Sequence, residues 1–424
     1  MKKVLFILCL VVVLTSCREN KNSEQASESE KQSDSSDIAF RPNFHFTPKE
    51  HWMNDPNGMF YYKGLYHLFF QYYPGGNVWG PMNWGHAVST DLVTWQQLPI
   101  ALKPDEKGYI FSGSAVVDKE NTSGFGTKEN PPIVAIFTYH DAEAAKEGKK
   151  DYQSQAIAYS VDEGKTWTKY KGNPVLPNPG IENFRDPKVS RDTIHNQWLM
   201  ALAADTKTLF YSSQNLKKWK LLSEFGEGIG AHGGVWECPD FFPIKVENSG
   251  ETKWVLIQSL NPGGYNGGSG TQYFVGDFDG KTFKLDSSMK DLGKDHSYWI
   301  DYGMDNYAGV TWANAPYPPD KKLFLGWMSN WLYGEKVPTT TWRSAMTLPR
   351  EMSLKKIGET YRIFSVPLPG LNNHMKMVYS QNRTTVDTKK IIAEDENINF
   401  SSAMISFDVP VSGTQRYIFQ LSNK

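Results

Sequence analysis

The chain has 424 residues and a formal net charge of −1, so it carries no strong charge excess of the kind that binds nucleic acid. Its length is sufficient for two or three average domains, or for one large all-β domain and a second one. Aromatic residues make up 14% of the chain, including 14 Trp and 21 Tyr. This share indicates either an aromatic-rich β fold or exposed rings that stack on sugars.

Residues 1–17 have the pattern of a bacterial lipoprotein signal peptide. Two lysines precede an apolar run at 4–14, which is too short for a stable membrane anchor. The sequence Leu-Thr-Ser leads directly into Cys17, which predicts lipidation of that cysteine. An ordinary signal peptide that happens to contain a cysteine is the alternative.

Residues 18–39 are rich in Ser, Glu, Lys and Gln and almost free of apolar side chains. Such a segment buries too little surface to fold, and it predicts a flexible polar tether. The chain is therefore expected to be an exported bacterial lipoprotein at the outer membrane, at the cell surface or facing the periplasm. It would contact the membrane through its lipid anchor only.

Cys238 is the only cysteine outside the predicted signal peptide, because the other two are Cys9 and Cys17. The body of the chain therefore has no partner for an intrachain disulfide and no cysteine-based zinc site. We expect core burial to hold the fold together.

From residue 40 to residue 355 the chain consists of short apolar or aromatic runs separated by Gly, Pro, Asn and Asp. Examples lie at 66–70, 133–137 and 254–257. These runs have the length and composition of β-strands, and no long segment has sustained helical periodicity. The pattern predicts an all-β fold.

An internal repeat accompanies these strands. The sequence Ser-x-Asp followed by an aromatic occurs at 89–95 and 160–167, with a third copy at 212–219 and a degenerate fourth at 277–283. A polar hairpin turn that recurs about once per four short strands is typical of a β-propeller. Four or five blades fit, and unrelated hairpins with shared turn chemistry are the alternative.

The pattern changes after Arg350. Segments at 404–409 and 417–421 alternate between apolar and polar residues, as sandwich strands do. Residues 356–424 are therefore expected to form a C-terminal β-sandwich. They are too few for a complete one, so the chain is either truncated there or has a reduced second domain.

Three acids stand beside aromatic residues in different predicted blades. Asp55 lies in Trp-Met-Asn-Asp-Pro-Asn-Gly at 52–58, Asp186 follows Arg185, and Glu237 lies in Val-Trp-Glu-Cys-Pro-Asp. Cleavage of a glycosidic bond requires one acid to protonate the leaving oxygen and one carboxylate to attack the sugar. The apolar neighbours of Glu237 suit a general acid, and Arg185 is expected to keep Asp186 ionised if the two side chains converge.

Each acid also has a structural interpretation. Asp55 could cap the amides of a surface turn, Arg185 and Asp186 could form a surface salt bridge, and Glu237 could be a rim residue. Propellers gather residues from several blades around a central channel, which favours the catalytic interpretation of all three together.

The three blocks resemble the signature blocks of glycoside hydrolase family 32, the family of invertases, levanases and inulinases. Further blocks resemble that family in the same order, at 69–72, 83–89, 111–114, 329–331 and 342–351. The resemblance implies a five-bladed β-propeller followed by a β-sandwich. It also implies a retaining double displacement on β-D-fructofuranosides.

By this resemblance Asp55 is the nucleophile, Glu237 is the acid/base and Asp186 stabilises the transition state. A retaining mechanism places the carboxyls of Asp55 and Glu237 roughly 5–5.5 Å apart. The mechanism requires no metal and no organic cofactor. The resemblance places seven further residues around the fructose, namely Asn54, Gln71, Trp79, Phe111, Ser112, Arg185 and Trp331.

The predicted function is exo-acting hydrolysis that releases fructose from levan, inulin or sucrose. Endo-acting members of the family share the same acids, so endo action stays open, as do the linkage and the oligomeric state. A non-catalytic fructan-binding lipoprotein would lack at least one of the three acids. A sialidase-like propeller would need three arginines and a tyrosine nucleophile, and the sequence offers no such set.

Overall fold

The computed structural model describes residues 40–290, 292–293, 296, 298–386, 389–391, 403–409 and 418–420. The predicted signal peptide with Cys17 and the predicted tether lie outside these residues. The described part of the chain contains no helix that is long and apolar enough to cross a membrane. Its strands form five antiparallel sheets, with one short parallel pairing in the first sheet.

Each sheet is one blade, in which the strands follow one another in chain order apart from β19, which joins the first sheet beside β1. Blades I and II contain β1 (His51–Tyr62), β2 (Leu65–Tyr73), β3 (Asn83–Ser89), β4 (Gln96–Leu102), then β5 (Tyr109–Val117), β6 (Ile133–His140), β7 (Gln153–Ser160) and β8 (Thr168–Lys169). Blade III contains β9 (Phe184–Asp192), β10 (Gln197–Ala204), β11 (Lys207–Ser213) and β12 (Lys220–Phe225). The short helix α2 (Ala142–Lys146) follows β6.

Blades IV and V complete the fold. Blade IV contains β13 (Val235–Lys245), β14 (Thr252–Asn261), β15 (Gly270–Phe278) and β16 (Phe283–Leu285). Blade V contains β17 (Tyr307–Thr311), β18 (Lys322–Trp327), β20 (Arg350–Ile357) and β21 (Thr360–Pro367). The remaining elements are β19 (Trp342–Arg343) and the 3-10 helices η1 (Gly334–Lys336) and η2 (Pro369–His374).

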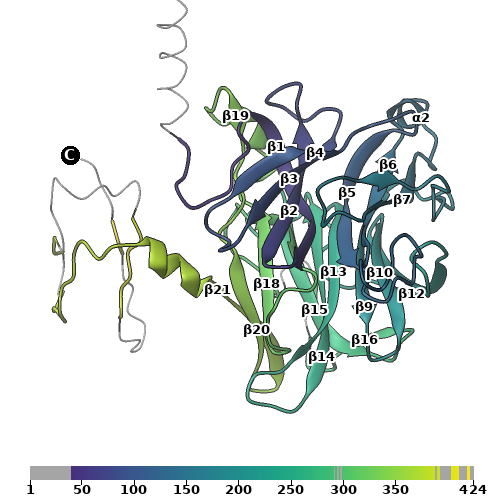
Figure 1. Ribbon diagram of the computed structural model, residues 1–424. Coiled ribbons are helices and arrows are strands. Elements are labelled where there is room, and N and C mark those ends of the chain that lie inside the picture. Colours follow the sequence, from purple (N-terminus) through teal and green to yellow (C-terminus); the bar gives the residue numbers. More distant parts are fainter. Residues whose placement is uncertain are drawn as a thin grey trace, which may run out of the picture. The chain divides into compact units, whose positions relative to one another are not determined.

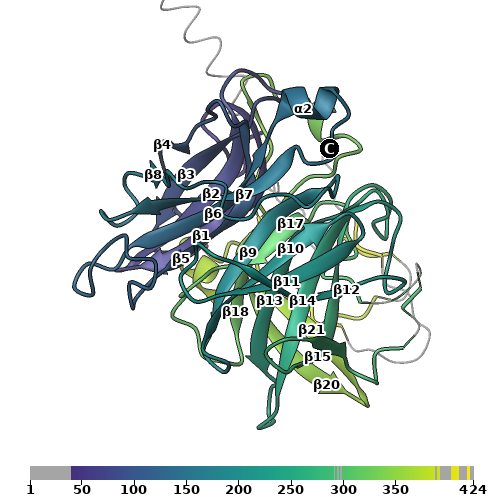
Figure 2. The same ribbon diagram turned by 90° about the vertical axis from the view of Figure 1, so that its right-hand side faces the viewer.

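The first strand of each blade faces a common axis. Contacts run from β1 to β5, β9, β13 and β17 in turn and from β17 back to β1, which closes a five-membered ring. Figures 1 and 2 show the five sheets arranged one after another around this centre. A narrow cavity on the axis is lined by residues from all five inner strands, including Pro56, Ser112, Pro187, Pro239 and Val310. The expectation of a five-bladed β-propeller is confirmed.

The ring is closed by strand pairing between its two ends. After β18 the chain crosses to blade I, where β19 pairs in parallel with the start of β1, placing Trp342 opposite His51. An isolated bridge between Phe60 and Ala313 adds a second link between blades I and V. These pairings join segments far apart in the sequence and hold the first blade against the last.

The predicted repeat occupies the same place in four blades, between the third and fourth strands. In blade I the backbone N–H groups of Leu92 and Thr94 donate to Ser89 Oγ (2.7 Å) and Asp91 Oδ1 (2.7 Å). The same two bonds recur around Ser160 and Asp162, and around Ser213 and Asn215. In blade IV the N–H of Thr282 donates to Asp279. The repeated polar residues therefore make repeated turns, in which short side chains satisfy backbone donors.

Large apolar side chains fill the spaces between neighbouring sheets. Blades III and IV, for example, share a cluster that includes Phe210, Phe241, Trp254 and Phe283. Truncating one such ring to Ala costs about 3–5 kcal/mol, which explains how the fold holds without disulfides. Much of the aromatic content therefore serves the core.

Blade V extends past residue 355, where the sequence pattern suggested a change of domain. The hairpin of β20 and β21 continues the sheet to Pro367, because β20 also pairs with β18. The alternating residues of β21 belong to this outer, half-exposed strand. By its internal contacts the chain divides into one unit that ends at Asn373 and a second unit at 374–424. The described residues of the second unit form no strand, so the C-terminal β-sandwich stays a prediction.

Candidate active site

All five inner strands are irregular at the same level of the axis. In β1 and β5 one residue, Asp55 and Ser112 respectively, is left without a partner in the neighbouring strand. In β9, β13 and β17 two residues face one, at 186–187, 238–239 and 308–309. A β-bulge bends its strand and re-aims the side chain beside it. The bulges thus turn the predicted acids toward the axis.

The sequence marks three of these bulges with proline, at Pro56, Pro187 and Pro239. Proline lacks an N–H group, and it is tolerated where a strand needs no donor, as in an edge strand or a bulge. Asp186 and Cys238 have φ angles of 64° and 45°, in the left-handed region that non-glycine residues rarely adopt. Backbone of this kind is held by its surroundings and often occurs at functional sites.

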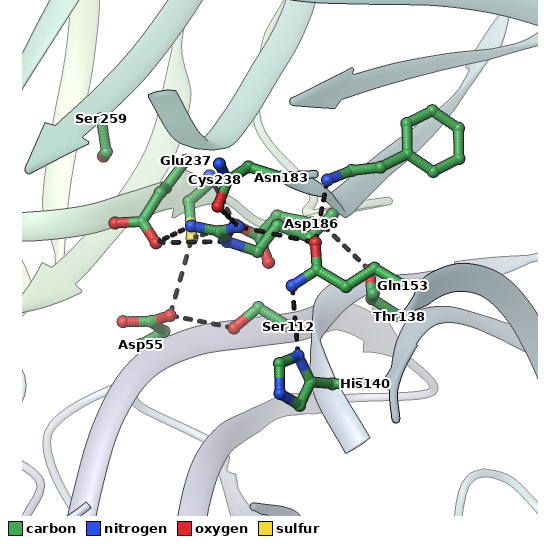
Figure 3. A network of polar contacts seen from close by, with 12 residues as sticks. Asp55, Ser112, Thr138, His140, Gln153, Asn183, Asp186, Glu237, Cys238 and Ser259 are labelled. Carbon is green, nitrogen blue, oxygen red and sulfur yellow. Dashed lines mark hydrogen bonds and ion pairs between the residues drawn. The ribbon is translucent and has the colours of Figure 1, made fainter. Parts of the chain in front are cut away.

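Asp55 lies at the bottom of the site in Figure 3, opposite Glu237. Its Oδ2 atom accepts a hydrogen bond from the Ser112 hydroxyl (3.0 Å) and lies 3.7 Å from the Cys238 thiol. Its Oδ1 atom is buried and has no hydrogen-bond partner among the described residues. Burial, and then the nearby Glu237 carboxylate, raise the pKa of Asp55. The carboxylate is thus held through its Oδ2 atom.

Asp186 is almost fully buried, with 6% of its surface exposed. Its Oδ2 atom accepts a hydrogen bond from the backbone N–H of Cys238 (3.0 Å), and its own N–H donates to Thr138 Oγ1 (3.0 Å). Burial raises the pKa of Asp186 to about 7, although the Arg185 guanidinium opposes the shift. The Arg185 guanidinium lowers the pKa of Asp186 in the expected direction, but burial raises it by more.

Arg185 has Glu237 as its main partner. Its Nη2 and Nε atoms donate to Glu237 Oε1 (3.0 and 3.3 Å), whereas its Nε lies 4.0 Å from Asp186 Oδ2. Nη1 donates to Asn183 (2.7 Å), which fixes the guanidinium. The Tyr307 hydroxyl donates to the other oxygen of Glu237, Oε2. Glu237 therefore stands in a polar network and not in the apolar setting that its sequence neighbours suggest.

The seven expected sugar-contacting residues fall into two groups. Ser112 and Arg185 join the carboxylate network directly. The other five make contacts outside the network. Asn54 accepts from Trp52 Nε1, and Gln71 donates to the Ile110 carbonyl. Trp79 and Phe111 meet edge to face, and Trp331 lies against Trp52 and Trp327. Their roles toward a sugar stay predictions.

Several members of this network were not predicted from the sequence. Tyr307 stands in no recognisable motif, and only the folded blade V brings it to Glu237. Cys238 is adjacent to Glu237 in the sequence, so a place near the site could be expected for it. Its thiol contacts with Asp55 and Asp186 could not be predicted, because those residues lie in other blades. Arg185 Nη1 donates to Asn183 Oδ1 (2.7 Å) and to Gln153 Oε1 (3.5 Å), and Figure 3 labels both of these acceptor residues.

We predict that Asp186→Asn stabilises the protein most at pH 7–8 and least near pH 4. The pKa of Asp186 is about 7 in the folded chain and about 3.9 in the unfolded chain. Between about pH 3.9 and pH 7 this carboxyl is ionised in the unfolded chain but still protonated in the folded chain. The free energy of unfolding of the wild-type chain therefore falls as the pH rises through this range. Asn does not titrate, can accept the Cys238 N–H bond and tolerates a positive φ. We expect a gain on the order of a few kcal/mol.

Thermal unfolding of both chains between pH 4 and pH 8 checks this expectation. Asp151→Asn is the matched control, because Asp151 is exposed. If the stability difference between Asp186→Asn and wild type is the same at every pH, the raised pKa of Asp186 is contradicted.

Comparisons with known proteins extend these observations. Residues 45–367 match the Glycosyl hydrolases family 32 N-terminal domain. The chain is 54% identical over 336 residues to levanase from Bacillus subtilis (strain 168), an alignment that covers 79% of this chain and 48% of the levanase. It is 46% identical over 352 residues to the extracellular exo-inulinase of Aspergillus awamori, covering 78% of this chain and 65% of that protein.

The fold has close counterparts among solved structures. The crystal structure of exo-inulinase from Aspergillus awamori superposes with a TM-score of 0.71 at 44% identity, covering 77% of this chain and 67% of that chain. The structure of fructofuranosidase from Schwanniomyces occidentalis complexed with fructose superposes with a TM-score of 0.69 at 42% identity. The alignment covers 78% of this chain and 64% of that chain. The chain spans about half the length of the levanase and just under two thirds of the exo-inulinase. On the match of residues 45–367, this chain belongs to glycosyl hydrolase family 32.

Proposed function

We propose that this chain is a retaining glycoside hydrolase that cleaves β-D-fructofuranosidic bonds in levan, inulin or sucrose. The observation that carries the proposal is the meeting of Asp55, Asp186 and Glu237, from three different blades, in one hydrogen-bonded network. The names of the relatives support the substrate class, since they include a levanase, an exo-inulinase and a fructofuranosidase complexed with fructose.

In the first step, the protonated Glu237 gives its proton to the glycosidic oxygen, and Asp55 attacks the anomeric carbon of the fructosyl unit. The bond to the leaving group breaks and an ester to Asp55 forms. The Ser112 hydroxyl and the Cys238 thiol hold the attacking carboxylate through its Oδ2 atom. In the second step, the ionised Glu237 takes a proton from water, and the water oxygen displaces Asp55 and releases fructose.

Arg185 and Tyr307 hold Glu237 from both sides, which fixes the carboxyl for both proton transfers. Asp186 is proposed to bind fructose hydroxyls and to stabilise the positive charge that develops on the sugar. Asn54, Gln71, Trp79, Phe111 and Trp331 are proposed to line the fructose pocket around this centre.

Exo action with release of single fructose units is the first candidate, and endo action is the second. Incubation of the full chain with levan, inulin and sucrose tests both. Fructose as the sole early product supports exo action, whereas a ladder of oligomers supports endo action. Absence of any fructose or oligomer from all three substrates would overturn the proposed hydrolase function.

The cellular setting is also a proposal. Cys17 is proposed to carry the lipid that anchors an exported protein, and residues after blade V are proposed to belong to a C-terminal β-sandwich. Palmitate labelling of the wild-type chain and of Cys17→Ala tests the anchor, since only the wild-type chain should incorporate label.

A further inference from the structure

Two tyrosines stand exposed on neighbouring loops of blades IV and V. Tyr265 is 55% exposed and Tyr302 is 48% exposed, and their rings meet edge to face with centroids 5.0 Å apart. Trp299 lies behind Tyr265 at 6.4 Å. We call Tyr265 and Tyr302 the tyrosine rim. An exposed aromatic pair beside a functional site commonly marks a binding surface.

The tyrosine rim belongs to the same strand ends that hold Glu237. Tyr265 lies in the loop that leaves β14 after Asn261, and Asn261 pairs with Val235, next but one to Glu237. Tyr302 lies in the segment that leads into β17, whose first residue, Tyr307, donates to Glu237. Both loops therefore start from the Glu237 side of the site.

A buried amide fixes these loops. Asn330 is fully buried, and its Nδ2 atom donates to the carbonyls of Gly267 (3.2 Å), Ser269 (3.3 Å) and Met304 (3.0 Å). The next residue, Trp331, packs against Trp52, close to Asp55 in β1. The rim is thus part of the structure that surrounds the carboxylates, and binding there loses little conformational entropy.

The surroundings of the rim suit a neutral ligand. Residues 261–271 contain no charged side chain. Of the nearby acids, Asp301 is paired with Arg350 (2.9 Å), and Asp305 accepts a hydrogen bond from the Tyr333 hydroxyl. Tyrosine rings with hydroxyl groups match a polyhydroxylated sugar chain, which has apolar C–H faces and many hydroxyls.

We infer that the tyrosine rim binds the fructosyl units of a polymer on the leaving-group side of the cleaved bond. The inference rests on the proposed function, in which Glu237 protonates the leaving oxygen. The leaving group must then lie on the Glu237 side, where the rim stands. In a fructan that leaving group is the remainder of the chain, long enough to reach past the carboxylates.

The test compares polymer with a short substrate. We expect the double variant Tyr265→Ala/Tyr302→Ala to lose about tenfold in kcat/KM on levan or inulin, because both rings that would stack on the polymer are removed. On sucrose, whose leaving group is a single sugar, the expected loss is less than about twofold. Tyr265→Phe/Tyr302→Phe keeps the rings and should keep most polymer activity. Phe364→Ala is the matched control, because Phe364 is an exposed aromatic on β21 in the outer part of blade V.

Equal loss on polymer and sucrose, or no loss on polymer, would overturn the inference. Binding of the inactive Asp55→Asn chain to levan or inulin in affinity electrophoresis gives a readout without turnover. The two alanines should abolish retardation of that chain, and unchanged retardation would count against the rim. If the wild-type chain hydrolyses none of these substrates, the proposed function is refuted. The electrophoresis result still shows whether the tyrosine rim binds fructan, because it does not depend on turnover.

Discussion

Asp55→Asn is expected to reduce fructofuranoside hydrolysis by about 10⁴-fold or more, with the fold retained. The amide oxygen is a poor nucleophile, so the covalent fructosyl intermediate cannot form at a useful rate. The contacts of Asp55 survive the change, because the Ser112 hydroxyl and the Cys238 thiol can both donate to an amide oxygen. Loss of a buried carboxyl whose pKa is raised removes a source of instability, so the melting temperature should not fall.

Initial rates on sucrose and levan, together with thermal unfolding, check this expectation. Ser112→Ala is the matched control, since it removes one hydrogen bond to Asp55 and leaves the carboxylate in place. We expect that variant to lose about tenfold to a hundredfold, far less than Asp55→Asn. Turnover at the wild-type rate by Asp55→Asn would refute the nucleophile assignment.

The sequence was informative about the propeller because local and global signals agree. The turns at 89–95, 160–167, 212–219 and 277–283 use short polar side chains to satisfy backbone donors, and this chemistry is local enough to be recognised in the sequence. The end of blade V was harder to predict. β21 is half exposed and alternates like a sandwich strand, so only its pairing with β20 assigns it to the propeller.

The acids of the site were recognisable for a related reason. The bulges at Asp55 and at Asp186, and the bulge at 238–239 directly after Glu237, each contain or adjoin a proline that can be read in the sequence. The sequence does not show which charged side chains pair with one another. Arg185 and Asp186 are adjacent in the chain, but the bulge in β9 separates their directions, and Arg185 crosses to Glu237 in the next blade. Tyr307 comes from a blade whose inner strand carries no acid, so its role appears only in three dimensions.

The exposed tyrosines illustrate the limit of composition. An aromatic share of 14% indicated either core packing or sugar binding, and the structure contains both buried and exposed aromatic residues. Phe241 and Trp254 fill the space between blades III and IV, whereas Tyr265 and Tyr302 face solvent beside the site. The two groups differ in burial. Burial depends on which strands pair, and this cannot be predicted from the residue type alone.

Glu237→Gln is expected to reduce hydrolysis of sucrose and levan by about 10³-fold, because the leaving oxygen then receives no proton. Gln has the size of Glu, and its Oε1 atom can still accept from Arg185. Its NH2 group then faces Tyr307, whose hydroxyl oxygen can accept from it instead of donating, so the network should largely persist. With an activated leaving group, such as a nitrophenolate, the first step needs no proton and should be nearly unaffected. The second step still lacks its base, so a fructosyl ester on Asp55 should accumulate and add the mass of one fructosyl unit to the protein.

Intact-mass measurement after rapid quenching detects that ester, and added azide should restore turnover by attacking it without base assistance. Gln258→Ala is the matched control, because Gln258 Nε2 donates to the backbone carbonyl of Glu237 (2.8 Å) and leaves its carboxyl untouched. That variant should lose activity to the same extent on every leaving group. An equal loss on activated and natural substrates by Glu237→Gln, without an accumulating ester, would mean that Glu237 acts only by holding Arg185 in place, and the proton donor would have to be sought elsewhere in the network.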